Sequence, residues 1–245
     1  MSADDFPFVK EHSFNTSWWG GPVGIVTQPQ FFTLPCEIRE QLLMAFDWVE
    51  YKSDGLIPEQ NQLIGDCGFF HADTQLNYKV SLRKKFLHDP SGIEIQWANE
   101  CPIEYTVDTI ASFKSERFFS VRSVNQRMLD TRYVLWGNIL ERSNPGLCLQ
   151  VLKNGHVQGW FFAEPIGNSK GIYLTLGMLS KHAVLRGMEF YNIFLDAYSS
   201  RGFEFGKAAF SVKNTPAHNI YCSLGVRFES PTDCWMWVNK RTNIY

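Results

Sequence analysis

The spacing of apolar residues predicts the helices in the second half of the chain. Apolar residues recur every three or four positions, as on the buried face of a helix, over 103–110, 129–140 and 188–198. A fourth such face runs from Ala217 to Leu224. It follows Asn214, a good N-cap residue, with Pro216 in the first turn, where a missing N–H does no harm. The sequence therefore predicts four helices after residue 100.

Strands are predicted around these helices. Ile93–Trp97 alternates apolar and polar residues, as a half-buried strand does. Asn154-Gly155 separates two apolar runs, and Asn-Gly is the strongest short signal for a β-hairpin because both residues tolerate positive φ. The further predicted strands are 147–152, 156–164, 172–179 and 203–213, with a last hairpin over 226–238. This order predicts an α/β (α+β) fold with a mixed, mostly antiparallel central sheet flanked by helices.

The first 92 residues show a weaker pattern. Helical spacing extends from Pro35 to Glu50, and loose alternation over 67–82 predicts one or two strands. The run Asp-Pro-Ser-Gly at 89–92 is a turn signal. We therefore expect an N-terminal α/β extension or subdomain over 1–92 and a second domain over 93–245.

Composition and charge narrow the class of function. The 23 basic and 25 acidic residues give a net charge of −2, so the basic excess that neutralises phosphates is missing and no nucleic-acid partner is expected. No run approaches about 18 consecutive apolar residues, and the acidic N-terminus does not resemble a secretory signal. The six cysteines are scattered without a Cys-x-x-Cys pair. We expect six reduced, mostly buried thiols in a cytoplasmic protein that has no membrane partner.

One segment carries a specific signal. Residues 214–226 read Asn-Thr-Pro-Ala-His-Asn-Ile-Tyr-Cys-Ser-Leu-Gly-Val. This segment resembles the Asn-x-x-Ala-x-x-x-Tyr-x-x-Leu-Gly-Phe motif of the GCN5-related N-acetyltransferase (GNAT) superfamily, with Val226 in place of Phe. The predicted element order is also similar to the GNAT fold. The resemblance implies that residues 93–245 form a GNAT-like acyltransferase domain.

Within this superfamily the whole chain most resembles the dTDP-fucosamine acetyltransferase group. The resemblance covers most of residues 13–238 and is spread over several short segments. These are the Trp18-Trp19-Gly20 turn, Gly68-Phe69-Phe70 before a predicted strand, Ser115-Glu116-Arg117-Phe118, and the Trp-containing strand at the end of the chain.

The resemblance implies acetyl-coenzyme A, or another acyl-coenzyme A, as the co-substrate, and no metal. The family holds the pantetheine arm of the coenzyme on main-chain groups at the end of the third central strand. Met178 and Leu179 occupy that place here. The family also uses the position of Asn214 for the arm, and the same side chain is expected to cap its helix.

The loop after this strand departs from the family pattern. The family usually has Gln/Arg-x-x-Gly-x-Gly/Ala there, and its main-chain N–H groups hold the pyrophosphate at a helix N-terminus. Only Arg186-Gly187 clearly matches this pattern; if His182 takes the first position, Leu185 replaces the first glycine and Gly187 is the second. A side chain at that position restricts positive φ and close approach of a phosphate. Either the loop follows another path or phosphate binding is weakened.

Acyl transfer from a thioester to an amine needs a neutral amine, a donor for the oxyanion and a proton for the leaving thiolate. The resemblance assigns the last role, that of general acid, to Tyr221; by its position alone Tyr221 is one member of an apolar helix face. Glu164, at a strand end, is the first candidate for a general base, followed by His156 and His182. Each of these three is also typical of a solvated or structural residue, and a chain of water molecules is the alternative.

The expected function is direct transfer of an acyl group from acyl-coenzyme A to a primary amine of a small molecule. By resemblance, the amine belongs to a nucleotide-linked amino sugar. An amino acid, a polyamine or a peptide amine is the alternative acceptor, and a non-catalytic GNAT-like binding module is the alternative of another class. His218, Cys222 and Cys234 imitate a metal site, but three soft ligands without a fourth do not favour one. The sequence leaves a homodimer open.

Overall fold

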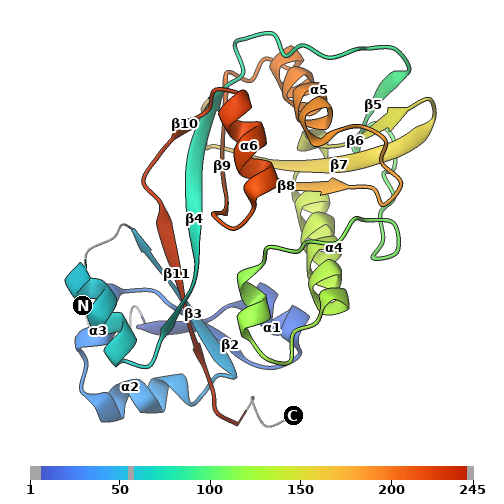
Figure 1. Cartoon of the computed structure of the whole chain (residues 1–245). Helices are drawn as coiled ribbons and strands as arrows, with labels where there is room; N and C mark the ends of the chain where they lie inside the picture. The colour runs from blue at the N-terminus through green and yellow to red at the C-terminus, as the bar shows by residue number, and fades with distance from the viewer. Residues whose placement is uncertain (1–6, 55–57, 242–245) are drawn as a thin grey trace. The chain divides into compact units, whose positions relative to one another are not determined.

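The structure is a computed structural model and describes residues 7–54 and 58–241 (Figure 1). By their contacts these residues divide into two units. Unit 1 contains the described residues up to 75, with 116–125 and those from 230 onward; unit 2 contains 76–115 and 126–229. The chain first passes from unit 1 to unit 2 within the strand β4 (Phe70–Ser81). The domain boundary at residue 92 stays a prediction, and the contacts assign 76–92 to unit 2 and 230–241 to unit 1.

Unit 1 is a sheet with three α-helices. Its strands lie in the order β1, β2, β3, β11 and the first part of β4, and all neighbours are antiparallel except β2 and β3. The strand bounds are β1 (Val9–Glu11), β2 (Val23–Val26), β3 (Trp48–Asp54) and β11 (Thr232–Val238). The helices are α1 (Ser13–Trp19), α2 (Cys36–Leu43) and α3 (Pro58–Asp66), with 3-10 turns η2 (Pro29–Thr33) and η3 (Arg117–Ser120). Aromatic side chains fill its core, including Phe31, Phe32 and Phe69.

Unit 2 contains the rest of the same hydrogen-bonded sheet, with helices on both faces of this part. Its strands lie in the order β4 (last part), β9, β8, β7, β6 and β5, antiparallel from β5 to β8 and parallel between β8 and β9. The strand bounds are β5 (Ile93–Trp97), β6 (Cys148–Lys153), β7 (His156–Pro165), β8 (Gly171–Leu179) and β9 (Phe205–Ser211), with β10 (Arg227–Phe228) paired to β4. The helices are α4 (Gln126–Ser143), α5 (Gly187–Ser200) and α6 (Thr215–Ser223), with the 3-10 turn η4 (Pro145–Leu147).

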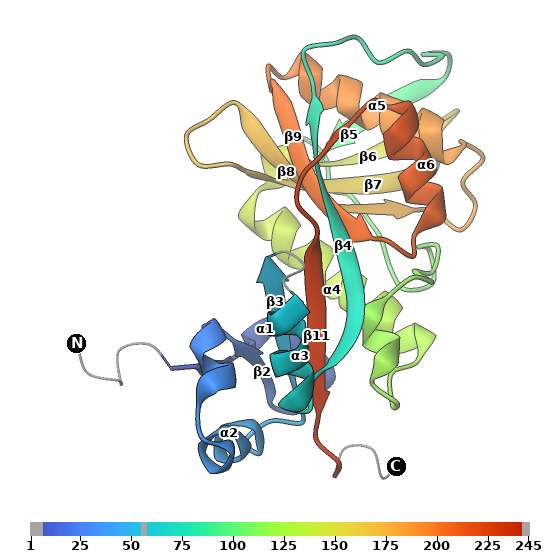
Figure 2. The same cartoon turned by 60° about the vertical axis from the view of Figure 1, so that its left-hand side comes forward.

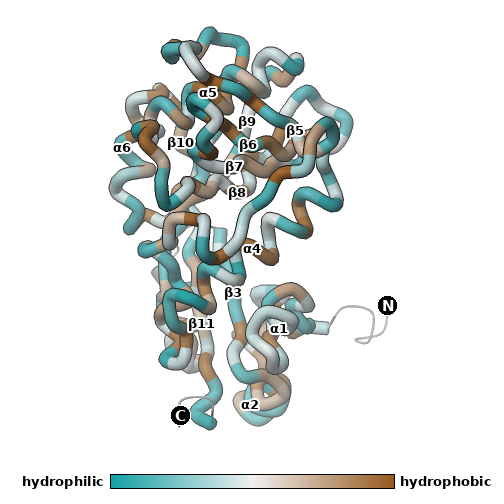
Figure 3. The backbone as a smooth tube through the Cα atoms, turned by 90° about the vertical axis from the view of Figure 1, so that its right-hand side faces the viewer, coloured by the Kyte–Doolittle hydropathy of each residue, from teal (hydrophilic) through white to brown (hydrophobic). Residues whose placement is uncertain are grey.

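Strand β7 shows which helices cover each face of this sheet, because successive side chains of a strand point to opposite faces. Trp160 and Phe162 pack in one hydrophobic cluster with residues of α4. Phe161 and Ala163 pack in a second cluster with residues of α5 and α6. Helix α4 therefore covers one face, and α5 and α6 cover the other (Figure 2). Hydrophobic stretches of the chain lie along the strands between them (Figure 3).

The predicted fold class is confirmed, and most elements of unit 2 lie where the apolar spacing placed them. The hairpin turn forms at Asn154 and Gly155, with φ of 52° and 79°. Asn214 caps α6 as predicted, since its Oδ1 accepts a hydrogen bond from the N–H of Ala217 at 3.1 Å.

Three predictions about individual elements are wrong. Residues 103–110 form no helix; Ile103 and Ile110 are buried in a non-helical segment, and Ile110 pairs with Ser180. The helix predicted from 35 to 50 ends at Leu43, because Trp48–Asp54 pairs with β2 and β11 as a strand. The last hairpin does not form, because β10 pairs with β4 in unit 2 and β11 pairs with β3 and β4 in unit 1. In each case partners distant in sequence overrode local spacing.

The cysteines are only partly as expected. All six are unpaired, but only Cys148 and Cys234 are buried, so the prediction of mostly buried thiols is wrong. Over 7–54 and 58–241, the structure contains no helix with the length and apolar character needed to span a membrane.

Candidate active site

Strands β8 and β9 part from each other inside the sheet of unit 2. Their parallel pairing ends with Tyr173 opposite Lys207. Two residues further, Thr175 is a β-bulge, because the residues on either side of it pair with the adjacent residues Phe162 and Ala163 of β7. The bulge therefore lies where β8 leaves β9. After Tyr173, residues 174–178 have no pairing with β9 among the described residues; we call this stretch the β8 edge.

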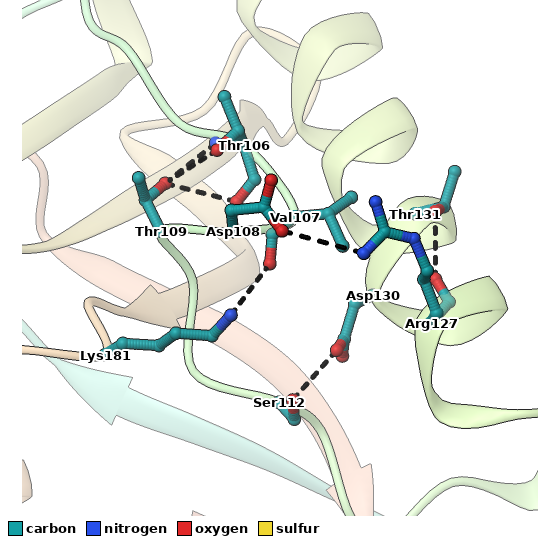
Figure 4. Close-up of polar contacts among 9 residues, drawn as sticks. All are labelled: Thr106, Val107, Asp108, Thr109, Ser112, Arg127, Asp130, Thr131 and Lys181. Atoms are coloured by element: carbon teal, nitrogen blue, oxygen red, sulfur yellow. Dashed lines mark hydrogen bonds and ion pairs between the residues drawn. The ribbon is translucent and has the colours of Figure 1, made fainter.

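A segment before α4 bounds the far end of the β8 edge. The N–H of Ala111 donates to the carbonyl of Leu179 at 2.7 Å, and the N–H of Lys181 donates to the carbonyl of Thr109 at 2.9 Å. The Lys181 ammonium also reaches the carbonyl of Val107 at 3.2 Å (Figure 4). The segment is tied to α4 by the hydrogen bond Ser112–Asp130 at 2.8 Å and the ion pair Asp108–Arg127 at 3.6 Å. Segment 106–112 is thus held by the end of β8 and Lys181 on one side and by α4 on the other.

The direction of main-chain groups along β8 decides which of them face this edge, since these groups alternate along a strand. The N–H of Ser180 donates to a β7 carbonyl at 2.8 Å, so Met178, two residues earlier, also points its main chain at β7. The carbonyl of Leu179 points the other way and is taken by segment 106–112. Gly177 shares that direction. Its N–H and C=O therefore point away from β7, to the side on which β9 is paired further back along β8. Gly177 was not among the residues predicted from the sequence, although a glycine inside a strand often marks close backbone approach.

Tyr221, the predicted general acid, lies in an aromatic cluster between α5 and α6. Its hydroxyl oxygen is 2.8 Å from that of Tyr191 on α5. Its ring centroid is 4.2 Å from that of Tyr78 and 4.7 Å from that of Phe210. Burial, followed by the neighbouring tyrosines, raises the pKa of Tyr221 well above its ordinary value. The phenol is therefore protonated throughout the neutral range, and Tyr191 and Tyr78 are hydrogen-bonding partners that sequence reasoning missed.

Glu164, the first candidate base, lies beside the bulge. Its carboxylate accepts a hydrogen bond from the hydroxyl of Thr175 at 2.9 Å. Glu164 follows Trp160 and Phe162 at intervals of two, so its side chain is on the face that α4 covers. Tyr221 belongs to the cluster on the opposite face. The structure does not bring the two side chains together on one face, and it places them on the two sides of the sheet that contains the β8 edge.

The loop from Lys181 to Arg186 uses its own main-chain N–H groups internally. Each of the six donates to an acceptor within unit 2. Lys181 donates to the carbonyl of Thr109 (2.9 Å), His182 to Oγ of Ser180 (3.2 Å) and Ala183 to the carbonyl of Ser180 (3.1 Å). Val184 and Leu185 both donate to Oε1 of Gln158, at 2.8 and 3.1 Å. Arg186 donates to Oε2 of Glu189 at 3.0 Å. These residues do not fit the phosphate-binding loop that the resemblance implies.

The two loop residues that match the family pattern have other surroundings. Arg186 is exposed. At Gly187, a Cβ atom would lie 2.8 Å from Cδ1 of Ile220, the terminal methyl group of that side chain on α6.

A cavity of about 510 Å³ lies beside the same loop. Its lining includes both histidines that the sequence singled out, His156 and His182, together with Glu104, Lys153 and Trp160. The Trp160 side chain is only 1% exposed, and its indole N–H has no hydrogen-bond partner among the described residues. The cavity thus offers side chains of both charge signs to a polar molecule. Across 7–54 and 58–241, no three His, Cys, Asp or Glu side chains gather as a metal site would require.

Comparison with known proteins relates this arrangement to a fold. No protein-family model and no curated protein sequence matches the chain. Among solved structures, a GCN5-related N-acetyltransferase from Sphaerobacter thermophilus superposes with a TM-score of 0.57 at 12% identity, covering 89% of this chain and 72% of that one. A tandem GNAT protein from the clavulanic acid biosynthesis pathway gives 0.56 at 12% identity, covering 89% and 76%.

A third similar structure is a GCN5-related glucosamine N-acetyltransferase region in a fungal multi-domain β-N-acetylglucosaminidase. Its TM-score is 0.56 at 8% identity, covering 88% of this chain and 30% of that one. The chain therefore has the fold of the GCN5-related N-acetyltransferases. The resemblance to the dTDP-fucosamine group stays a prediction.

Proposed function

We propose that unit 2 is an N-acyltransferase that moves an acetyl or other short acyl group from acyl-coenzyme A to a primary amine. The β8 edge carries the proposal, because a bulge and the parting of two parallel strands leave Gly177 facing away from β7 with no partner in β9. The pantetheine arm is an extended chain with amide groups, and such a chain can pair with a strand edge as another strand would. The fold shared with N-acetyltransferases supports the same conclusion.

The proposed reaction is a direct transfer without a covalent intermediate on the protein. The neutral amine attacks the thioester carbonyl, so that a C–N bond forms and the C–S bond breaks. The amine gives its proton to Glu164 or to water, and the departing thiolate takes a proton from Tyr221. We assign the Gly177 N–H to the oxyanion and Asn214 to the pantetheine arm.

The environment of Tyr221 supports its role as the acid. Burial raises the pKa of Tyr221, so the phenol holds a proton at neutral pH, but the same rise lowers the driving force for its transfer to a thiolate, whose thiol has an ordinary pKa of about 8.5. The Tyr191 hydroxyl at 2.8 Å provides a route for the proton to be replaced.

The acceptor we propose is the amine of an amino sugar, carried on a nucleotide. The cavity on the α4 side offers carboxylate, imidazole, ammonium and indole groups, which suits a ligand with many hydroxyl groups. One protein of the same fold is a glucosamine N-acetyltransferase region, which supports an amino-sugar acceptor. An amino acid, a polyamine and a peptide amine are the alternatives that a panel must include.

The test is thiol release from acetyl-coenzyme A in the presence of this amine panel. We expect thiol release that depends on the amine, fastest with a nucleotide-linked amino sugar, and an N-acetylated product of the expected mass. Release with a polyamine or a peptide only would overturn the acceptor. No release with any amine, together with no heat of binding on titration of acetyl-coenzyme A, would leave the non-catalytic binding module instead.

A further inference from the structure

The loop between β8 and α5 is already saturated with hydrogen bonds. The six consecutive N–H groups from Lys181 to Arg186 all have acceptors at 2.8–3.2 Å. A diphosphate bound by such a loop needs those N–H groups for its own oxygens. In this chain side-chain and main-chain oxygens of the protein occupy them.

Gln158 is fixed in this role by its surroundings. Its side chain is on β7 and the residue is 1% exposed. Its Oε1 accepts from both Val184 and Leu185, and its amide nitrogen donates to the carbonyl of His156 at 2.9 Å. Moving Gln158 away would leave a buried amide and two N–H groups without partners unless the incoming ligand satisfied all of them, which is costly in a buried site.

Glu189 adds an electrostatic obstacle. Its carboxylate lies in the first turn of α5 and accepts from the N–H of Arg186 at 3.0 Å. A helix N-terminus favours an anionic group, and here the protein's own carboxylate supplies one at the N-cap. A diphosphate at this position would bring further negative charge against Glu189.

We infer that this loop does not hold the diphosphate of coenzyme A and that the donor is recognised through its acyl-pantetheine arm. This inference rests on the proposed function, because it concerns the donor of the same reaction. The arm occurs both on free coenzyme A and on carrier proteins, and the chemistry that the β8 edge recognises is the same in both.

The direct test compares acetyl-coenzyme A with acetylpantetheine, which has the same arm but neither diphosphate nor nucleotide. We expect kcat/KM values within fivefold of each other, and Kd values for coenzyme A and pantetheine within fivefold by calorimetry. A preference larger than fivefold for the full coenzyme in both measurements overturns the inference while the proposed function stands. Failure of both thioesters to react with any amine overturns the proposed function itself.

Acetylated acyl carrier protein, as a third donor, distinguishes the two sources of the arm. Faster transfer than from acetylpantetheine assigns the arm to a carrier, and equal or slower transfer assigns it to a free thioester; both agree with the inference.

A variant tests the part played by Gln158. Gln158→Ala frees the N–H groups of Val184 and Leu185, so we expect the Kd of coenzyme A to fall at least threefold relative to that of pantetheine. Gln150→Ala is the matched control, because Gln150 is another largely buried glutamine, on β6, whose amide contacts Gln96 rather than the loop. If the Kd of coenzyme A divided by the Kd of pantetheine stays the same or rises in Gln158→Ala, Gln158 does not block the diphosphate.

Discussion

The hydroxyl oxygens of Tyr191 and Tyr221 lie 2.8 Å apart, where α5 and α6 meet on one face of the unit 2 sheet. Burial raises the pKa of both phenols. The Tyr221 hydroxyl also interacts with that of Tyr78, so three phenols share one hydrogen-bonded group. In the proposed reaction Tyr221 gives its proton to the thiolate, and the neighbouring phenols can replace it.

We expect Tyr221→Phe to lower kcat about 100-fold at neutral pH, because general acid catalysis typically contributes that much or more. Tyr191→Phe should lower kcat less, because it removes only the second phenol of the pair. Initial rates of thiol release from pH 7 to 9.5 measure both effects. Tyr173→Phe, which removes an exposed phenol on β8, is the control and should leave the rate unchanged. Full activity in Tyr221→Phe would remove the acid assignment.

The buried tyrosines also make a prediction about stability. Burial raises the pKa of Tyr78, Tyr198 and Tyr221 well above 10.0, whereas in the unfolded chain these phenols ionise near that value. Above pH 10 the unfolded state therefore binds fewer protons than the folded state, and the free energy of unfolding falls as pH rises. The stabilisation is fully present below pH 9 and is lost above it, by up to about 1.4 kcal/mol per phenol per pH unit.

Urea unfolding at pH 8, 9.5 and 10.5 measures this loss. Tyr198→Phe should give a shallower fall between pH 9.5 and 10.5 than the parent, although it also loses the hydrogen bond from Tyr198 to the carbonyl of Leu147 at 2.7 Å. Tyr173→Phe should keep the parent slope, because Tyr173 is exposed. Equal slopes in all three proteins would contradict the account.

Glu164 can be tested against its neighbour at the bulge. If Glu164 accepts the amine proton, Glu164→Gln should lower kcat about 100-fold with little change in KM. Thr175→Val removes only the hydroxyl that donates to Glu164 at 2.9 Å and should cost less than tenfold. Steady-state kinetics of both variants decide between the roles. An equal loss in the two would show that Glu164 acts through the position of the bulge.

Local pattern was sufficient for the elements whose structure depends on neighbouring residues. The Asn154-Gly155 turn and the Asn214 cap follow from the backbone and side-chain chemistry of those residues alone. The position of β11 could not be predicted in this way, because Thr232–Val238 pairs with residues more than 150 positions earlier. The apparent helix at 103–110 had the correct spacing, but Ile110 pairs with Ser180 instead.

The residues of the candidate site also differ in whether the sequence indicated them. Tyr221 and the unusual loop at 181–189 were visible in the sequence, since each depends on a short motif. Gln158 was not, because its role consists of hydrogen bonds to residues 26 and 27 positions later. The contact between Tyr191 and Tyr221 joins two helices and has no signal within either.

The close contact between β7 and β8 should make Gly159 intolerant of a side chain. A Cβ atom there would lie 2.4 Å from the main-chain oxygen of Met178, which cannot move without disturbing the strand pair. We expect Gly159→Ala to lower stability by about 1–3 kcal/mol and the thermal midpoint accordingly. Gly65→Ala is the control, because no atom lies within 4 Å of its Cβ position in α3. It should raise stability by up to about 1 kcal/mol. Similar midpoints for the two variants would contradict the close contact.

Asn214 has two proposed roles that substitution can separate. As the N-cap of α6, its Oδ1 accepts from the Ala217 N–H at 3.1 Å, and Asn214→Ala should cost about 1 kcal/mol of stability. Asn214→Ser keeps a capping oxygen but shortens the side chain and removes the amide, so its stability should stay near that of the parent. If the amide also binds the pantetheine arm, Asn214→Ser should raise the KM for the thioester severalfold despite normal stability. Thermal unfolding with steady-state kinetics measures both quantities, and parent-like KM in Asn214→Ser would restrict Asn214 to the cap.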